Sequence, residues 1–357
     1  MSPAKLRDLN CFAPILVLVF VLTAVAQAVA SQQTLEVALL DSATPISSPD
    51  DVEFEIAGRK AQITAWKRNE RAAPAPVAII FHSDAVEKDF QREARMAVLT
   101  FTAHLASAAH PVLLVEIEQE KVQAVIEASS KPEDVAAALK AAESGSATKA
   151  DTLGMAEAIR SFRKRLPSVP AQILNRRLQG MELAFHTFRA CISALRGYAG
   201  PKALVWVGAR IDLDLSDSGR MEFPLPHDPA GLKITRGLEA LLRDTLKDLL
   251  ATHTSVLPIP MPERPYEVDS IKLGVDTSLR NFAGMTGGEN IRSGRDIRQL
   301  GEAFKKAAAL IRARSGAYYL ANIALPGEQK AGKWIRFKVK SRQGPMTLAG
   351  PTGLFSE

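Results

Sequence analysis

Three polar residues whose side chains could do chemistry, His82, Ser83 and Asp84, follow directly on the apolar run Val77 to Phe81. An unbroken apolar run of this length is typical of a central strand buried on both faces of a parallel α/β sheet. Ligands bind at the carboxyl ends of such strands, which is where these three residues lie. An imidazole, a hydroxyl and a carboxylate suit either nucleophilic hydrolysis or cation binding.

Hydrolysis by these three residues is not expected. Adjacent residues on a turn point their side chains apart, so they cannot form a relay of nucleophile, base and orienting group. The sequence contains no G-x-S-x-G, H-E-x-x-H or G-x-G-x-x-G motif and no phosphate-binding loop. We therefore expect a protein that is not an enzyme and has no catalytic residues.

Composition excludes some classes of partner. The chain has 357 residues, of which 24% are charged and 46% hydrophobic, and this is ordinary for a globular protein of one or two domains. The net charge of +6 is spread along the chain. This pattern does not favour nucleic-acid binding.

Residues 1–30 have the features of a secretory signal peptide. Lys5 and Arg7 precede the apolar run Phe12 to Val25, and Ala28-Val29-Ala30 supplies a cleavage signal, so we expect cleavage near Ala30. The mature chain would be periplasmic or secreted, with no membrane span. An uncleaved anchor is the alternative, although the apolar run is shorter than the roughly 20 residues of a spanning helix. Cleavage would leave Cys191 as the remaining cysteine, so no intrachain disulfide is expected.

Three segments make up the rest of the predicted organisation. Residues 31–75 are predicted to form a small β-rich lead-in, with a hairpin from Phe54 to Trp66. Residues 76–315 alternate strand and helix patterns, which favours an α/β fold with a doubly wound, mostly parallel sheet flanked by helices. Residues 316–357 again have strand patterns, which predict a C-terminal β-hairpin that packs on the lead-in.

Within the α/β segment the patterns predict helices at residues 88–107, 132–142, 152–165, 180–195, 234–252, 278–284 and 293–314.

Several stretches, in their order and spacing, resemble the von Willebrand factor A-like domain of exported bacterial, notably acidobacterial, proteins. They are the hairpin Phe54 to Trp66, the strand Val77 to Phe81, the strand Pro201 to Val207, Thr286-Gly287-Gly288 with Ala317-Tyr318-Tyr319-Leu320, and the strand Trp334 to Lys340. The resemblance covers most of residues 34–357. It implies a doubly wound fold with a divalent cation held at the tops of the strands, the metal-ion-dependent adhesion site of that family.

The residues at the family's motif positions differ from those that hold the cation. In the family the first strand ends in D-x-S-x-S, and a later Asp completes the site, since Mg²⁺ prefers oxygen ligands. Here these positions are His82, Asp84, Val86 and Ala209. We therefore predict a degenerate site with no metal and no cofactor, in which His82 and Asp84 cap the turn between strand and helix.

Two functional hypotheses follow, and an enzyme is a third, which would require a pocket with a titratable pair that the spacing of residues does not reveal. The first is a non-catalytic binding or scaffold module that contacts an unknown protein partner without metal, at the strand tops and at the loop of residues 211–231. That loop contains the candidate partner-binding residues Asp212, Asp214 and Asp217, and it spells D-x-S-x-S from Asp214 to Ser218. The second is a metal-dependent adhesion module with a rebuilt Mg²⁺ or Ca²⁺ site, for which Ser83, Asp84, Thr152 and the same loop are the candidates.

Overall fold

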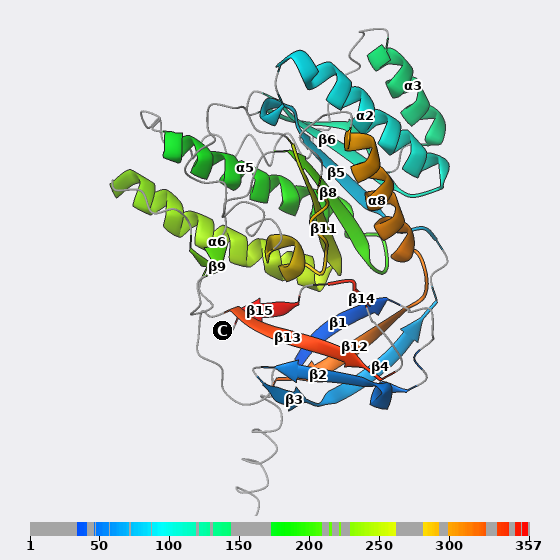
Figure 1. Ribbon diagram of the computed structural model, residues 1–357, viewed down its shortest axis with the longest axis vertical. Coiled ribbons are helices and arrows are strands. Elements are labelled where there is room, and N and C mark those ends of the chain that lie inside the picture. The colour runs from blue at the N-terminus through cyan, green and yellow to red at the C-terminus, as the bar shows by residue number, and fades with distance from the viewer. Residues whose placement is uncertain are drawn as a thin grey trace, which may run out of the picture.

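Two structural units, a β unit and an α/β unit, make up the part of the chain that the computed structural model describes (Figure 1). That part comprises residues 34–40, 46, 48–56, 58–70, 73–86, 88–118, 121–128, 131–143, 173–208, 214–215, 221–222, 229–261, 281–292, 299–325, 334–342, 347–350 and 352–355. No helix within these ranges is long and apolar enough to cross a membrane.

A five-stranded sheet forms the centre of the α/β unit. Its strands, in spatial order, are β11 (Thr254–Pro260), β8 (Lys202–Gly208), β5 (Val77–His82), β6 (Val112–Glu118) and β7 (Lys121–Ile126). The first four are parallel, and β7 joins the edge antiparallel to β6. The predictions of a mostly parallel sheet and of a buried strand at 77–82 are therefore confirmed.

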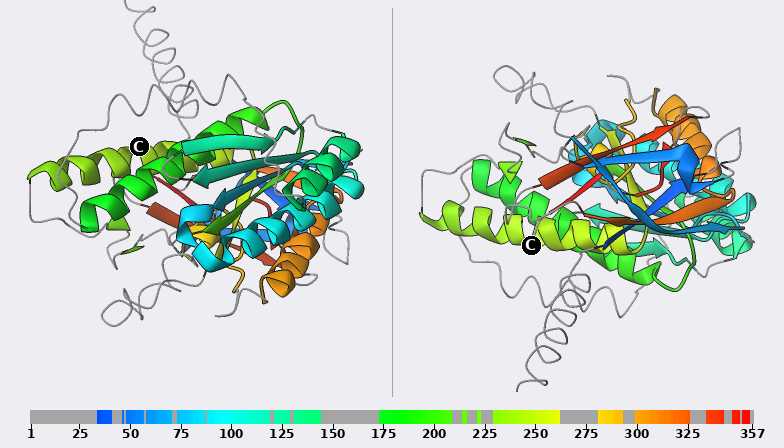
Figure 2. Two further views of the ribbon diagram at one scale, coloured as in Figure 1. Left: turned by 90° about the horizontal axis from the view of Figure 1, so that it is seen from above. Right: turned by 90° about the horizontal axis from the view of Figure 1, so that it is seen from below.

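Helices cover both faces of this sheet. They are α2 (Lys88–Ser107), α3 (Pro132–Glu143), α5 (Ile173–Ala194), α6 (Pro229–Ala251) and α8 (Leu300–Ala313). Helices α2 and α8 pack on one face, whereas α5 and α6 run side by side on the other (Figures 1 and 2). The chain passes from β5 to β6 through α2, and later returns to place β8 and β11 on the other side of β5. The strand order therefore reverses between β5 and β8.

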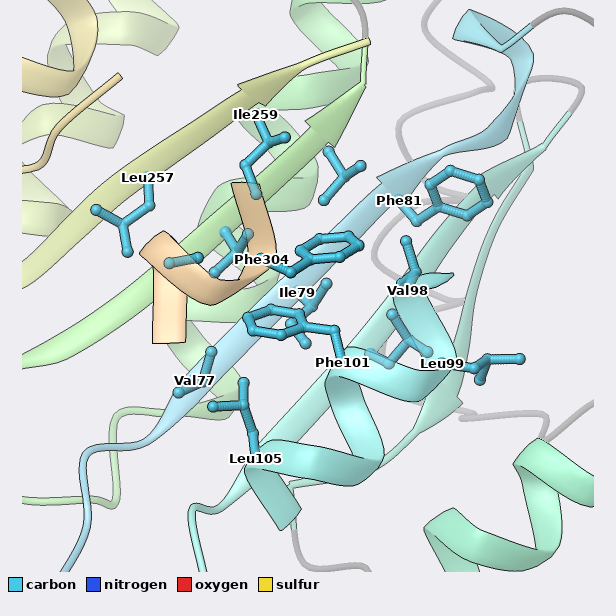
Figure 3. Packing of buried hydrophobic residues seen from close by; sticks show 14 of the residues in the cluster. Val77, Ile79, Phe81, Val98, Leu99, Phe101, Leu105, Leu257, Ile259 and Phe304 are labelled. Atoms are coloured by element: carbon cyan, nitrogen blue, oxygen red, sulfur yellow. The ribbon is translucent and has the colours of Figure 1, made fainter. Parts of the chain in front are cut away.

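The two cores follow from the apolar periodicity of the elements. Residues Ile79 and Phe81 of β5 point toward α2 and α8, where the rings of Phe101 and Phe304 stack at a centroid distance of 4.5 Å (Figure 3). The alternate positions of β5 point to the core under α5 and α6, because successive residues of a strand face opposite sides. That second core contains Phe185, Phe188, Ile192, Leu195 and Trp206.

The β unit is a sandwich of two four-stranded sheets. Sheet I contains, in spatial order, β14 (Thr347–Leu348), β1 (Thr34–Leu40), β12 (Tyr318–Ala324) and β4 (Ile63–Asn69). Sheet II contains β15 (Gly353–Phe355), β13 (Trp334–Ser341), β2 (Val52–Ile56) and β3 (Arg59–Ala61). A core shared by the two sheets includes Leu39, Phe54, Ile56, Tyr319 and Phe337. The two ends of the described chain thus build one unit together.

The prediction of a C-terminal β-hairpin is wrong. Strand β12 lies between β1 and β4 in sheet I, whereas β13 lies between β15 and β2 in sheet II. Both edges of β12 are thus occupied by strands of the lead-in, so β13 cannot pair with it. The lead-in hairpin forms, but it is shorter than predicted: β2 and β3 pair around Gly58, and Trp66 lies in β4 of the other sheet.

Other boundaries also differ from the predictions. Helix α6 begins at Pro229, and the predicted loop of residues 211–231 contains a small antiparallel pair, β9 (Asp214–Leu215) with β10 (Met221–Glu222). Two short 3₁₀ helices, η1 (Pro49–Asp51) and η2 (Ser83–Ala85), precede β2 and follow β5. The predicted helix at 152–165 lies outside the described residues.

The Thr286-Gly287-Gly288 motif covers the outer edge of β11. The Thr286 hydroxyl accepts a hydrogen bond from the Val256 amide at 3.0 Å, and the Ile291 amide donates to the Pro258 carbonyl at 2.9 Å. A Cβ atom at Gly288 would lie 1.8 Å from the Val256 carbonyl oxygen, so a side chain here would separate the segment from the strand. The motif thereby pairs main-chain groups that an edge strand leaves open.

The same motif joins the two units. A Cβ atom at Gly287 would lie 1.7 Å from the carbonyl oxygen of Gly350, which lies between β14 and β15 of the β unit. The buried Arg314 guanidinium donates to the Gly287 carbonyl at 3.1 Å, and burial lowers the pKa of Arg314 to about 10. Ser255 of β11 adds a hydrogen bond to the Ala349 carbonyl at 2.9 Å. The glycines are therefore required for close approach of two backbones.

Candidate functional site

The carboxyl ends of β5 and β8 form the candidate site, because the strand order reverses between them. His82 ends β5 and Gly208 ends β8. A Cβ atom at Gly208 would lie 2.6 Å from the Cβ atom of His82, so the strand ends approach closely. The absent side chain at Gly208 leaves room for the imidazole ring and for Trp206 next to it.

The side chain of His82 points toward the core under α5 and α6. Its ring lies 5.8 Å from the ring of Trp206, and its Nδ1 atom is buried without a hydrogen-bond partner among the described residues. Burial lowers the pKa of His82 below its ordinary value of 6.5, and the charge of Asp84 offsets part of this effect. The imidazole is therefore neutral at pH 7.

The predicted capping role of His82 is wrong. His82 occupies the position before η2, but its side chain makes no capping hydrogen bond. The imidazole instead points toward Trp206, because alternate positions along β5 face the core under α5 and α6. Asp84 lies in the first turn of η2 and is exposed, so its carboxylate is directed at solvent.

Ser83 is fully buried and binds to the neighbouring strand. Its hydroxyl donates a hydrogen bond to the Ile117 carbonyl of β6 at 2.9 Å. The main-chain carbonyl of Ser83 accepts a hydrogen bond from the Gln91 amide group of α2 at 3.1 Å. Ser83 thus fixes the turn between β5 and α2 rather than presenting its oxygen to solvent.

Val86 completes the set of motif positions that the structure describes. It is 3% exposed and packs in the core between the sheet and α2. Among His82, Ser83, Asp84 and Val86, therefore, Asp84 alone presents a side-chain oxygen to solvent. Phe90, near the start of α2, is 43% exposed. Among the described residues it is the one large apolar side chain that is exposed to solvent.

An ion pair beside the site was missed by the sequence reasoning. Arg95 of α2 donates through Nε to the Glu116 carboxylate of β6 at 2.9 Å, and Glu116 is 7% exposed. Burial raises the pKa of Glu116, and Arg95 offsets only part of that rise. The sequence does contain a sign of this ion pair. Glu116 is a single glutamate within the apolar strand Val112 to Ile117, and a buried carboxylate requires a partner. The pair ties α2 to the sheet and leaves Arg95 half-exposed.

The remaining predicted site residues are not brought together by the described structure. Ala209, Thr152, Asp212 and Asp217 lie outside the described residues, and Asp214 is described only through the backbone pairing of β9 with β10. Within the described ranges, no three His, Cys, Asp or Glu side chains form a group that could hold a metal ion. Cys191 is fully buried, and burial raises the pKa of its thiol, so it is no nucleophile.

Comparisons with known proteins do not identify a family. No protein-family model and no curated protein matches the sequence. Among solved structures, two crystal forms of proximal thread matrix protein 1 from the mussel byssus match 67% and 70% of the chain, at 13% identity and TM-scores of 0.33 and 0.36. The matched region spans about half, 48%, of the mussel protein.

A third solved structure is the N-terminal domain of TFIIH p34. It matches 65% of this chain and 96% of its own, at 14% identity and a TM-score of 0.30. All three TM-scores are below 0.5, so these likenesses carry no argument about function.

Proposed function

We propose that the chain is an exported, non-catalytic protein-binding or scaffold module with a von Willebrand A-like fold, which contacts its partner at the strand tops without a divalent cation. One observation carries the proposal: of the described motif positions, only Asp84 offers an exposed oxygen. A scaffold of this kind without its cation ligands must act through surface contact.

The donor chemistry supports the absence of a cation site. Mg²⁺ requires a near-octahedral set of hard oxygen ligands and Ca²⁺ requires six to eight. His82 offers a nitrogen that faces a core, and Val86 offers no ligand atom. The Ser83 hydroxyl is buried against the Ile117 carbonyl. A cation bound to the Asp84 carboxylate would have to take nearly all of its other ligands from outside the motif positions.

The exposed residues that remain suit a protein partner. We define the strand-top surface as Asp84 with Lys88, Asp89 and Phe90, all of which are exposed. An exposed aromatic ring is typical of protein interfaces, and the charged side chains around Phe90 would form the polar rim of the contact. The loop that contains Asp212, Asp214 and Asp217 is a second candidate contact. No reaction is proposed, since no nucleophile and base pair is placed at this end of the described structure.

Affinity capture tests this proposal. The tagged mature chain should capture the same protein from an extract of its own cells in EDTA and in Mg²⁺. The double variant Asp84→Lys with Phe90→Ala should lose that protein, because it changes both the charge and the aromatic contact. Reversing the charge of exposed Glu133 on α3 is the matched control and should leave capture unchanged. Capture that requires Mg²⁺, or that survives the double variant, would contradict the proposal.

A rebuilt cation site is the second candidate function, and the exposure of Asp84 at a strand end favours it. In this alternative Asp84 would be joined by Thr152 and by the carboxylates of the Asp212–Asp217 loop. The oxygens would have to converge within about 2.0 to 2.6 Å of one Mg²⁺ or Ca²⁺ ion. A cation titration separates the two candidates.

A further inference from the structure

The outer face of sheet II carries an excess of positive charge. Alternate residues of β13 turn inward and outward: Ile335 and Phe337 are buried, whereas Arg336, Lys338 and Lys340 are exposed. We call this surface the cationic face and define it by five exposed cations and three half-buried acids: Lys60, Arg336, Lys338, Lys340, Arg342, Asp51, Glu53 and Glu55. Its net charge is +2, from five cations and three carboxylates.

All three acids of the cationic face already have a partner, and the Asp51 carboxylate accepts a hydrogen bond from the Ser48 amide at 3.1 Å. Glu53 lies 2.8 Å from the Lys60 ammonium, and Glu55 lies 3.0 Å from the Lys340 ammonium. The hydrogen bonds from the two lysines lower the pKa of Glu53 and Glu55, so both stay ionised at neutral pH. The other three cations, Arg336, Lys338 and Arg342, form no direct ion pair with any residue that the structure describes, although the charges of Lys338 and Arg342 act on Glu55 and Glu53. They are therefore available to an external anion.

The arrangement of these charges suits an extended anionic surface. Outward residues two apart on a strand are separated by about 7 Å, so Arg336, Lys338 and Lys340 form a row along β13. Lys60 of β3 lies across the sheet from that row, with β2 between them. A broad sheet face with cations spread over it matches a layer of negative head groups better than a single small anion, which is usually bound in a concave site.

The described part of the chain begins beside this face. Thr34, the first residue of β1, pairs with Ala324, whose amide donates to the Gln62 carbonyl at 2.8 Å. Gln62 directly follows β3, the edge strand of the cationic face. Residues 26–33 separate Thr34 from the apolar run that ends at Val25, and such a stretch spans at most about 30 Å. Under the alternative in which residues 12–25 stay as an uncleaved anchor, that anchor would hold this edge of sheet II close to the lipid, whereas after cleavage near Ala30 the charges of the cationic face would have to bind by themselves.

We infer that the cationic face docks onto an anionic phospholipid surface. Each Lys or Arg near such a surface strengthens binding about fivefold, and salt screens the attraction. The face lies on the β unit, away from the carboxyl ends of β5 and β8 (Figure 1). Docking would therefore leave the strand-top surface free for a protein partner, and the inference does not depend on the proposed function.

Vesicle sedimentation tests the inference with the mature chain that begins at Ser31, which contains all of the described structure. We expect binding to phosphatidylcholine vesicles that contain 30% phosphatidylglycerol, no binding to phosphatidylcholine alone, and release in 0.5 M NaCl. The triple variant Arg336→Gln, Lys338→Gln, Arg342→Gln should weaken binding on the order of 100-fold. The matched control, Arg92→Gln, Lys131→Gln, Arg312→Gln, removes three exposed cations from the α/β unit and should weaken it less than tenfold.

Three results would overturn the inference. The first is equal binding to neutral and anionic vesicles, or binding to neither. The second is an equal loss in the two triple variants, which would show that net charge and not this face is responsible. The third is tight binding of soluble heparin to the cationic face with no binding of anionic vesicles, which would indicate an acidic polymer instead. The salt and lipid dependence of the unsubstituted chain tests the inference even where a variant folds poorly.

Discussion

Replacing Gly287 with alanine is expected to destabilise the protein by at least about 3 kcal/mol. Gly287 has a φ of +71°, a backbone conformation that side chains disfavour. An added Cβ atom would also lie 1.7 Å from the Gly350 carbonyl oxygen. That oxygen belongs to the main chain, so it cannot rotate away as a flexible side chain would. Relief of the clash therefore requires the α/β unit and the C-terminal strands to separate locally.

Gly237→Ala provides the control for this prediction. Gly237 lies within α6, and no atom would lie within 4 Å of an added Cβ. Alanine at a helix position should stabilise the protein by about 0.5 to 1 kcal/mol. Urea unfolding followed by circular dichroism measures both variants. A loss below about 1 kcal/mol for Gly287→Ala would show that this junction is not as tight as described.

Trp206→Ala is expected to cost about 3 to 5 kcal/mol, the range for removing a buried aromatic side chain. Trp206 is 1% exposed and contacts Phe188 edge-to-face at a centroid distance of 5.3 Å. Its removal would leave a cavity between β8 and α5. Trp66→Ala is the comparison, since Trp66 is only half-buried against Tyr319, and its loss should be smaller. Equal losses for the two variants would contradict this description of the core.

The same variant should raise the pKa of His82. Burial against Trp206 lowers that pKa in the folded protein, so the neutral imidazole stabilises the fold above about pH 6.5. This stability is lost as the pH falls through the lowered folded pKa. Water entering the cavity of Trp206→Ala would bring the pKa closer to 6.5 and flatten the contribution of His82 to the pH dependence. Carbon-13 NMR of labelled histidines, in the native and the urea-unfolded chain, measures the shift.

The sequence was sufficient for elements whose apolar spacing is local. The run Val77 to Phe81 correctly predicts a strand at the centre of a parallel sheet, because both of its faces must be apolar there. The spacing of Phe185, Phe188 and Ile192 correctly predicts one buried face of α5. Both patterns depend on the geometry of a single element and on no distant partner.

Contacts between distant segments could not be predicted in this way. Strands β12 and β13 are neighbours in sequence, which favours a hairpin, yet β12 pairs with β1 and β4 from the other end of the chain. The burial of Ser83 likewise depends on the register of β5 against β6, which places the Ile117 carbonyl within reach of its hydroxyl. Apolar periodicity contains no information on such register, so the place of His82, Ser83 and Asp84 at a strand end could be predicted but the directions of their side chains could not.

Isothermal titration of the mature chain with Mg²⁺, Mn²⁺ and Ca²⁺ tests most directly whether the strand tops function without a cation. We expect no binding tighter than about 1 mM for any of the three ions, because Asp84 alone offers an exposed oxygen among the described motif positions. The variant Asp84→Ala should give the same titration. Micromolar binding that Asp84→Ala abolishes would contradict the account and establish the rebuilt cation site instead.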